Sequence, residues 1–478
     1  MIIKETMRLI NEFLSRIEKH KNILFSNSAT PFDYIIDAFN EWLLTIKSRI
    51  ENNGNGNITE LRKVIYRIGK EISTYVGQVR NKWLRIYRLE LEKLVEELKE
   101  GKTTIIIAGE PFNEDKSFEV FLYTDYLTIE IERVAKSGSI VINIPLIGPG
   151  GLHIIVPKLF NDHMLKAMQY GLFMTDGSVD HEGYPVMNTN HLWQAITWLL
   201  TWPGNSHIYV YGISVNRNNV KVIWQLKAID YKGKIGHKIE ISKEILDFND
   251  EEFMIFLLFA VLGDGSIKVK NERIMLGIGH LKHELWGEII DRLKSYGFRD
   301  YDNKAAKIYQ ISGFKAVDLI WKWLSKSEIK TLIEDLSILH DAEKLRNLMV
   351  LANTKIKPLG RSSIEVVNNI SMTVHILGKG FVRLIIHRHN PEDAKIILEK
   401  LQGAGYDAKL STWGGRFVVY INQREIIKHP ELVIKVYEIL LKMLEEALHE
   451  NNLKRAQKII KIIKAINTKL DLKSISPK

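Results

Sequence analysis

Two aspartates, Asp176 and Asp264, occupy matching positions in the sequence and could share one chemical task. Each ends an apolar, helix-like segment and precedes a glycine, a serine and a β-branched residue, in QYGLFMTDGSV and LLFAVLGDGSI. The carboxylates are therefore expected at helix C-termini, where the helix dipole disfavours negative charge. If the two helices pack side by side, the carboxylates also repel each other. A divalent cation would relieve both conflicts, because carboxylate and carbonyl oxygens suit Mg²⁺.

A pair of metal-binding carboxylates beside a cleft is typical of phosphodiester hydrolysis, in which the metal generates hydroxide and stabilises the leaving oxygen. We expect two or more Mg²⁺ ions at such a site. The ordinary alternative is that Asp-Gly simply ends a helix and starts a turn. Repetition of the whole pattern favours the catalytic interpretation.

The segments before the aspartates carry small residues, which let two helix backbones approach closely. In the first helix these residues recur at a spacing of four, at Ala167, Gly171 and Thr175. The second helix carries Ala260 and Gly263 near the corresponding end. The glycines that follow, Gly177 and Gly265, suit the left-handed position just past a helix C-terminus.

The elements around the two aspartates follow one order, helix–strand–strand–helix–strand–strand–helix, given twice between residues 159 and 360. An internal duplication is therefore the main organising feature of the chain. The length predicts several domains. We expect four parts: a helical N-terminal domain (1–101), a small β-rich module (102–158), the core (159–360, halves 159–240 and 241–360), and a C-terminal ββαββα module with a basic helical tail (361–478).

Composition limits the function further. The chain contains no cysteine, which excludes disulfides, thiolate zinc sites and cysteine nucleophiles. A hydrophobic content of 45% and a charged content of 26% are typical of a soluble globular protein, and a net charge of +10 favours a polyanionic partner. No apolar run reaches the roughly 18 residues of a membrane span, and the N-terminus lacks a signal peptide, so a cytoplasmic location is expected. Richness in Ile, Lys and Glu without cysteine indicates a thermophilic source.

The paired motifs QYGLFMTDG and LLFAVLGDGSI resemble those of the LAGLIDADG homing endonucleases of the single-chain, two-motif type. The resemblance implies an α+β fold with a duplicated αββαββα core and pseudo-twofold symmetry. It also implies that Asp176 and Asp264 are catalytic and bind Mg²⁺. The implied function is site-specific cleavage of double-stranded DNA that mobilises an intron or another genetic element.

In that family the sheets that follow each motif form a saddle on DNA, and alternating residues face its grooves. Lysine and arginine can neutralise phosphates, while glutamine can read adenine edges. The expected DNA contacts are Arg217, Lys221, Gln225, Lys268, Lys270, Arg273, Lys307 and Gln310. Lys227 and Lys315 are the candidates for the family's basic residue near the scissile phosphate. The plain alternative is that these side chains lie on solvated sheet faces.

A second hypothesis is a nucleic-acid-binding protein, an intron maturase or DNA-binding regulator, that keeps this fold without cleavage. Retention of both aspartates speaks against it, because a pure binder would gain from losing their repulsion. The sequence leaves DNA and RNA open as partners. The core is expected to act as a monomer, and the N-terminal helices could mediate dimerisation or brace the chain internally.

Overall fold

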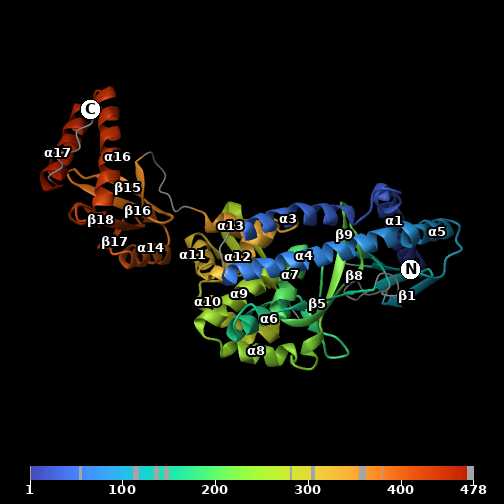
Figure 1. Cartoon of the computed structure of the whole chain (residues 1–478). Coiled ribbons are helices and arrows are strands. Elements are labelled where there is room, and N and C mark those ends of the chain that lie inside the picture. Colours follow the sequence, from blue (N-terminus) through green and yellow to red (C-terminus); the bar gives the residue numbers. More distant parts are fainter. Residues whose placement is uncertain are drawn as a thin grey trace. The chain divides into compact units, whose positions relative to one another are not determined.

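The computed structural model describes residues 2–52, 56–110, 118–133, 139–144, 150–279, 283–302, 307–354, 362–378 and 380–470 (Figure 1). The chain divides into two compact units. The first unit comprises Met1–Lys268, Ile274–Gln310 and Trp321–Met349, and the second comprises Val269–Arg273, Ile311–Ile320 and Val350–Lys478. Most of the segments expected as an N-terminal domain, a β-rich module and a core therefore belong to one unit.

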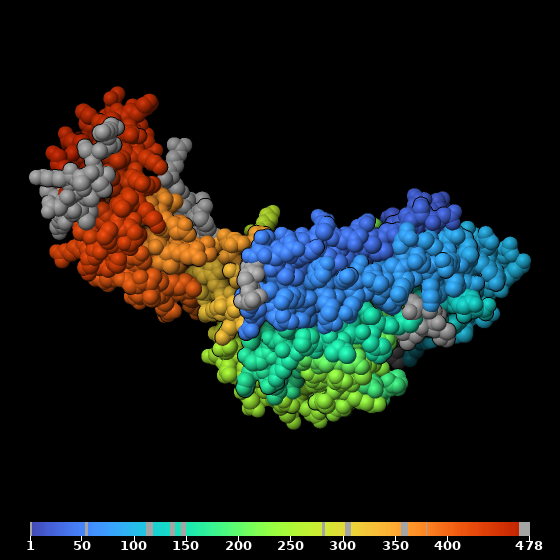
Figure 2. Space-filling model, in the orientation of Figure 1, coloured from blue at the N-terminus to red at the C-terminus, as the bar shows by residue number. Residues whose placement is uncertain are grey.

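The N-terminal hundred residues are helical, as their amphipathic pattern predicts. The helices are α1 (Ile2–Lys19), α2 (Lys21–Leu24), α3 (Asp33–Glu51), α4 (Asn57–Lys82), a π-helical turn η1 (Trp83–Tyr87) and α5 (Arg88–Lys99). Figure 1 shows α3 and α4 side by side, and in Figure 2 this blue segment covers one flank of the first unit. The helices bury their apolar sides, including Phe13, Phe39 and Trp83, within that unit.

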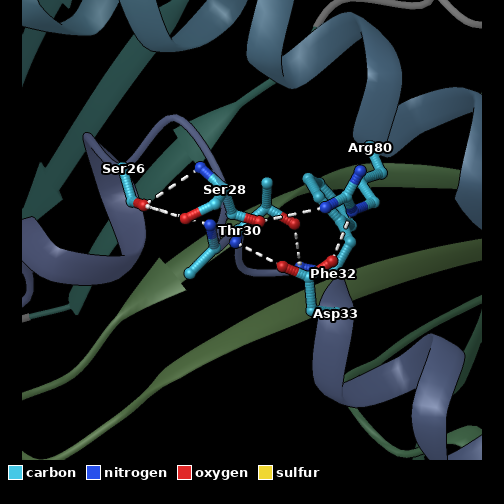
Figure 3. A network of polar contacts seen from close by, with 7 residues as sticks. Ser26, Ser28, Thr30, Phe32, Asp33 and Arg80 are labelled. Carbon is cyan, nitrogen blue, oxygen red and sulfur yellow. Dashed lines mark hydrogen bonds and ion pairs between the residues drawn. The ribbon is translucent and has the colours of Figure 1, made fainter.

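A polar network fixes the loop between α2 and α3 against α4 (Figure 3). The Arg80 side chain on α4 forms an ion pair with Asp33 and donates to the carbonyl of Ser28 at 3.0 Å. Asp33 in turn accepts a hydrogen bond from the amide of Thr30 at 2.6 Å. The loop is thereby held by the helix that lies beside it, in addition to its own turn, in which Ser26 Oγ accepts from the amides of Ser28 and Ala29.

A buried carboxylate joins the N-terminal helices to α12 (Ser327–Leu336). Asp335 is fully buried and accepts hydrogen bonds from Arg62 Nε at 2.8 Å and Arg49 Nη1 at 2.5 Å. The indole Nε1 of the buried Trp42 donates to the Asp335 carbonyl at 2.8 Å. Three residues of α3 and α4 thus hold one turn of α12, so these helices brace the first unit internally.

A nine-stranded sheet runs through the first unit in the order β1-β2-β3-β4-β8-β9-β7-β6, with β5 also paired to β8. Its strands are β1 (Ile105–Gly109), β2 (Phe118–Tyr123), β3 (Thr128–Glu132), β4 (Ser139–Asn143), β5 (Leu152–Val156), β6 (Gly177–Val179), β7 (Pro185–Thr189), β8 (Gly204–Val215) and β9 (Val220–Ala228). The strands expected as a separate β-rich module instead extend this sheet. The reason is that the long β8 offers its free edge to β4, with Val141 opposite Ser214, and to β5.

The first αββαββα segment consists of α6 (Asp162–Thr175), β6, β7, α7 (Leu192–Thr201), β8, β9 and α8 (Lys238–Leu246). The second consists of α9 (Asp250–Asp264), β10 (Gly265–Lys268), β11 (Arg273–Ile278), α10 (His283–Ser295), β12 (Arg299–Asp302), β13 (Lys307–Ser312) and α11 (Phe314–Trp323). The strands follow the order β6-β7-β9-β8 in the first sheet and β10-β11-β13-β12 in the second. The fold is therefore a mixed α+β fold with antiparallel sheets, as expected.

The second unit contains a five-stranded sheet in the order β14-β15-β16-β18-β17. Its elements are β14 (Ser363–Val367), β15 (Ile370–Ile376), β16 (Val382–Arg388), α14 (Pro391–Gly403), β17 (Ala408–Trp413), β18 (Arg416–Asn422), α15 (Gln423–Ile426), α16 (Pro430–His449) and α17 (Leu453–Leu470). The ββαββα order appears as expected, with β14 added at one edge. No helix in the described parts of the chain is long and apolar enough to cross a membrane.

Candidate nucleic-acid interface

The two helices that end in the candidate aspartates pack against each other through small residues. A Cβ added to Gly171 on α6 would lie 2.6 Å from the carbonyl oxygen of Phe256 and 2.6 Å from Cβ of Phe259, both on α9. A Cβ added to Gly263 on α9 would lie 2.0 Å from Oγ1 of Thr175. The backbones therefore approach more closely than any larger residue allows. The predicted pairing of the two helices through these residues is confirmed.

The glycines after the aspartates serve close approach and not a left-handed turn. Gly265 has extended backbone angles, φ −92° and ψ 174°, and Gly177 begins strand β6 without a positive φ. A Cβ on Gly265 would lie 2.4 Å from the Val261 carbonyl, and one on Gly177 would lie 2.7 Å from Cα of Phe173. The left-handed prediction is wrong because each chain turns directly from helix into strand and folds back onto the last helical turn.

The ends of α6 and α9 border a cleft of about 490 Å³. Asp176 lines it from the C-cap of α6, and Gln194 on α7 donates its side-chain amide to Asp176 Oδ2. Asp264 is the last residue of α9 and is exposed. The two sheets reach the same cleft, since Asn188 at the end of β7 and Lys268 at the end of β10 both line it.

A lysine that the sequence analysis did not single out lies at the end of α9. Lys344, on α13 (Glu343–Ala352), donates to the carbonyls of Leu262 and Gly263, both at 2.7 Å. Burial lowers the pKa of Lys344 to about 8, while the charges of Asp176 and Asp264 act in the opposite direction. The ammonium thus lies near both carboxylates and satisfies the helix carbonyls that no intrahelical amide can reach. The Lys344 ammonium therefore offsets the negative charges of Asp176 and Asp264.

These contacts bear on whether the residues fit a magnesium ion. The carbonyl oxygens at the end of α9, which were expected to complete the metal shell, accept hydrogen bonds from Lys344. Within the described ranges, no group of three acidic or histidine side chains could hold a metal. The protein ligands therefore do not form a complete magnesium site. An ion would depend on oxygens from water or from a bound phosphate.

Two further polar residues complete the wall of the cleft. Burial lowers the pKa of His191 to about 4, and the nearby charges of Lys221 and Lys344 act in the same direction. The His191 ring is therefore neutral at physiological pH. Asp341 accepts a hydrogen bond from the amide of Leu192 at 2.5 Å, at the N-terminus of α7, and burial raises the pKa of its carboxyl. The only feature of the sequence that could have indicated this wall of the cleft is Gln194, a polar residue within the apolar run LWQAITWLL.

The outward face of the first sheet carries three of the predicted residues. Along β9, buried residues alternate with the half-buried Lys221, Gln225 and Lys227. The register places Asn188 of β7 opposite Gln225, so this face continues to the cleft. The sheet therefore presents amide and ammonium groups on the side where the two motif helices end.

The two candidates for a basic residue at a scissile phosphate lie elsewhere. Lys227 forms ion pairs with Asp180 at 2.7 Å and with Glu182 at 2.8 Å, and it is not among the residues that line the cleft. Lys315 belongs to the second unit and forms an ion pair with Glu392 there. Lys227 is thus paired with two carboxylates of the first unit, and Lys315 is paired with one carboxylate of its own unit.

The remaining predicted DNA contacts lie on several elements of the chain. Arg217 forms an ion pair with Glu12 of α1 at 3.1 Å. Lys268 and Lys270 were expected on one strand with alternating faces, but β10 ends at Lys268 and Lys270 belongs to a 3-10 turn (Val269–Asn271), so the alternation does not continue to it.

Three other predicted DNA contacts, Arg273, Lys307 and Gln310, lie on β11 and β13 of the second sheet. Arg273 begins β11 half-buried, and its Nε has no hydrogen-bond partner among the described residues. Lys307 and Gln310 are three residues apart on β13, so they point to opposite faces of the strand. Of these three residues, Arg273 and Gln310 lie on the side of their strands that alternates with buried residues, and Lys307 does not.

Comparison with known proteins gives little further guidance. No protein-family model matches the chain, and no curated protein matches it. Among solved structures, the chain is similar to the crystal structure of full-length DUF199/WhiA from Thermatoga maritima, at 12% sequence identity and a TM-score of 0.24. The match covers 65% of this chain and 93% of that chain. A similarity at this TM-score carries no argument about fold or function.

The assignment to the LAGLIDADG homing endonucleases is nevertheless corrected by these comparisons. No family model supports the motif resemblance, and the solved structure reported above is a DUF199/WhiA protein and not a homing endonuclease. The small residues in these short motifs indicate that two helices pack closely, and such packing is not specific to one family. The packing was predicted correctly from them, but the family was not.

Proposed function

We propose that this chain is a DNA-binding protein whose core binds duplex DNA along the outward faces of the two antiparallel sheets. The matching strand orders of the two sheets, and the pairing of α6 with α9, support a duplicated core with pseudo-twofold symmetry. The observation that carries the proposal is that both sheets border one cleft, with Asn188 of β7 and the exposed Lys268 of β10 on its wall. The Asn188 amide and the Lys268 ammonium can bind a phosphate of the DNA backbone, while Lys344 offsets the nearby charges of Asp176 and Asp264.

Lys344 also removes the main argument for cleavage. The two aspartates repel each other at helix C-termini, and this repulsion was the reason to expect a metal. The Lys344 ammonium lies near both carboxylates and supplies the positive charge that the metal was to provide. Both aspartates can therefore be retained in a protein that only binds DNA.

Magnesium-dependent hydrolysis of DNA stays a prediction and is the second candidate function. The observation that favours it is the placement of Asp176 on an accessible cleft with its carboxylate oriented by Gln194. Magnesium would supply hydroxide and charge stabilisation when bound. The chain itself would contribute the two carboxylates, and Gln194 would fix the orientation of one of them.

Duplex binding should depend steeply on salt, because basic residues that neutralise phosphates release counterions from the DNA. We expect the variant Lys221→Gln, Lys268→Gln to lower the salt slope by about 2 and to weaken binding across sequences. The measurement is fluorescence anisotropy with a duplex library between 50 and 200 mM salt. The variant Lys63→Gln, Lys243→Gln, at exposed positions of α4 and α8, removes the same charge and is the control. An equal loss in the control would show that these two lysines do not contact DNA.

Incubation of the same library with Mg²⁺ separates the two candidate functions. Binding alone predicts that the wild type and the variant Asp176→Asn, Asp264→Asn retain the duplex equally and leave it intact. Discrete, metal-dependent fragments that appear with the wild type and disappear in the variant would establish the hydrolase instead.

The pKa of Lys344 predicts opposite effects of pH on binding and on stability. The ammonium is charged below about pH 8 and neutral above it, so duplex affinity should fall as pH rises from 7 to 9. In the unfolded chain the lysine keeps its proton to higher pH, so the free energy of unfolding should rise over the same window. His191, with its pKa near 4, does not titrate there. Lys344→Arg should abolish the pH dependence of binding, and persistence of that dependence would exclude Lys344 as its cause.

A further inference from the structure

The sheet of the second unit has one face packed by helices and one face that carries polar side chains. On β16 and β18 the residues Leu384, Ile386, Val419 and Ile421 are buried, and α14 packs on these strands. The intervening residues point to the other side, which we call the outer face. The register of the four strands β15, β16, β18 and β17 places on it His375, Arg383, His387, Lys409, Arg416, Trp413 and Tyr420.

The outer face is positively charged. None of these four strands contains an aspartate or a glutamate, and the fifth strand, β14, adds one carboxylate to this face at Glu365, which lies opposite Ser371 of β15. Arg416, Lys409 and His387 are exposed, and Arg383 is half-buried. Burial lowers the pKa of His387, and the nearby Arg416 and His375 act in the same direction. A sheet face with cationic groups on three strands suits a polyanion.

Aromatic rings lie between these charges. The Arg383 guanidinium lies over the ring of Tyr420, 4.7 Å from its centroid. The rings of His387 and Trp413 approach to 6.4 Å between centroids, although they belong to the two strands on either side of β18. Val418, which lies opposite His387 in the register, is fully buried. Phe381, just before β16, is 53% exposed.

We propose that this outer face is a second nucleic-acid-binding surface and that it takes single-stranded DNA. The rings of Tyr420 and Trp413 would stack with bases, while Arg383, Lys409 and Arg416 would bind phosphates. The choice of DNA over RNA rests on the function proposed for the core. The proposal that the outer face binds a single strand rests only on its own charges and rings.

The chemistry of the face favours a single strand over a duplex. Half-exposed rings on a sheet can stack only with bases that have left the double helix, and such stacking is largely independent of sequence. A duplex would offer phosphates to the cations but nothing to the rings. The mixture of rings and cations on one sheet face therefore selects unpaired bases.

The test compares two variants of the full chain that lose equal charge. One carries Arg383→Gln, Lys409→Gln and Arg416→Gln on the outer face. The other carries Lys395→Gln, Lys442→Gln and Lys454→Gln on the exposed sides of α14, α16 and α17. Binding to labelled dT15, U15 and a 15-base-pair duplex is measured by anisotropy, and circular dichroism checks folding. A third variant, Trp413→Leu with Tyr420→Leu, removes the rings and keeps the charges.

We expect the outer-face charge variant to bind dT15 at least tenfold more weakly and with a lower salt slope, and the helix variant to bind it like the wild type. The ring variant should lose about tenfold for dT15 and little for the duplex. Equal losses in the two charge variants, or a ring variant that binds dT15 normally, would overturn the proposal. Tighter binding of U15 than of dT15 would overturn the choice of DNA.

The two proposals fail separately in these experiments. The core variant Lys221→Gln, Lys268→Gln should lose duplex binding and keep dT15 binding. If the wild type does not bind the duplex but the outer-face variants still lose dT15, the function proposed for the core is wrong and the single-strand surface stands.

Discussion

Gly171→Ala is expected to destabilise the first unit by about 1–3 kcal/mol, the usual cost of overpacking a tight core. Alanine normally stabilises a helix interior relative to glycine by about 1 kcal/mol. At Gly171, however, the added methyl group would lie 2.6 Å from the Phe256 carbonyl oxygen of α9. A backbone atom cannot rotate away as a side chain can, so α6 and α9 must separate. The larger Gly171→Val should cost more and should also disturb the cleft at the helix ends.

The chain offers a matched control for this prediction. Gly77, in α4, has open space around the position of an added Cβ. Gly77→Ala should therefore raise the free energy of unfolding by up to about 1 kcal/mol. Urea unfolding followed by tryptophan fluorescence measures both variants. If both substitutions stabilise the protein equally, the close approach of α6 and α9 is absent in solution.

Asp335→Ala is expected to cost about 3–5 kcal/mol, because it leaves the guanidinium of the buried Arg62 without its carboxylate. Asp335 is fully buried and links α12 to Arg62 on α4 and Arg49 on α3. The loss should loosen the contact between the N-terminal helices and the core. Amide hydrogen exchange in α12 should therefore accelerate more than exchange elsewhere in the first unit.

Two other substitutions separate the charge from the packing. Asp291 is exposed on α10, and Asp291→Ala should change stability by no more than about 0.5 kcal/mol. Replacing both partners, with Arg62→Met added to Asp335→Ala, should recover much of the loss, because no buried charge then lacks a partner. A double variant less stable than Asp335→Ala would mean that Arg62 stabilises the unit through its packing and not through this pair.

The order of elements was predictable because it depends on local patterns. Periodic apolar residues define α6 and α9, and small residues at Gly171 and Gly263 indicate that the helices touch. Alternating residues define β9, and Lys221 and Gln225 share a face as predicted. The extension of the first sheet by β1–β4 was not predictable, because strand pairing across distant segments depends on which edge is free in three dimensions.

The candidate site was only half predictable for the same reason. Asp176 and Asp264 are adjacent to recognisable helices, so their positions at helix ends followed from the sequence. Lys344 is far from both in the chain and belongs to no motif, and only folding brings its ammonium to the end of α9. The argument for a metal at the two aspartates therefore could not take Lys344 into account, and the metal stays a prediction.

In the proposed complex, the extension of the first sheet would also limit the length of DNA that the core covers. On the outward side of β2 and β3, Glu119 and Glu132 are paired in the register and Glu130 shares their face. Burial raises the pKa of Glu132, and the charges of Glu119 and Glu130 act in the same direction, as expected for crowded carboxylates. A duplex that follows the sheet from β6 would meet this negative surface just beyond β4. The five strands from β6 to β4 are separated by four spacings of about 4.8 Å and span roughly 19 Å, the length of between five and six base pairs. The footprint of this half of the core should therefore end abruptly on that side, within about half a turn of the helix.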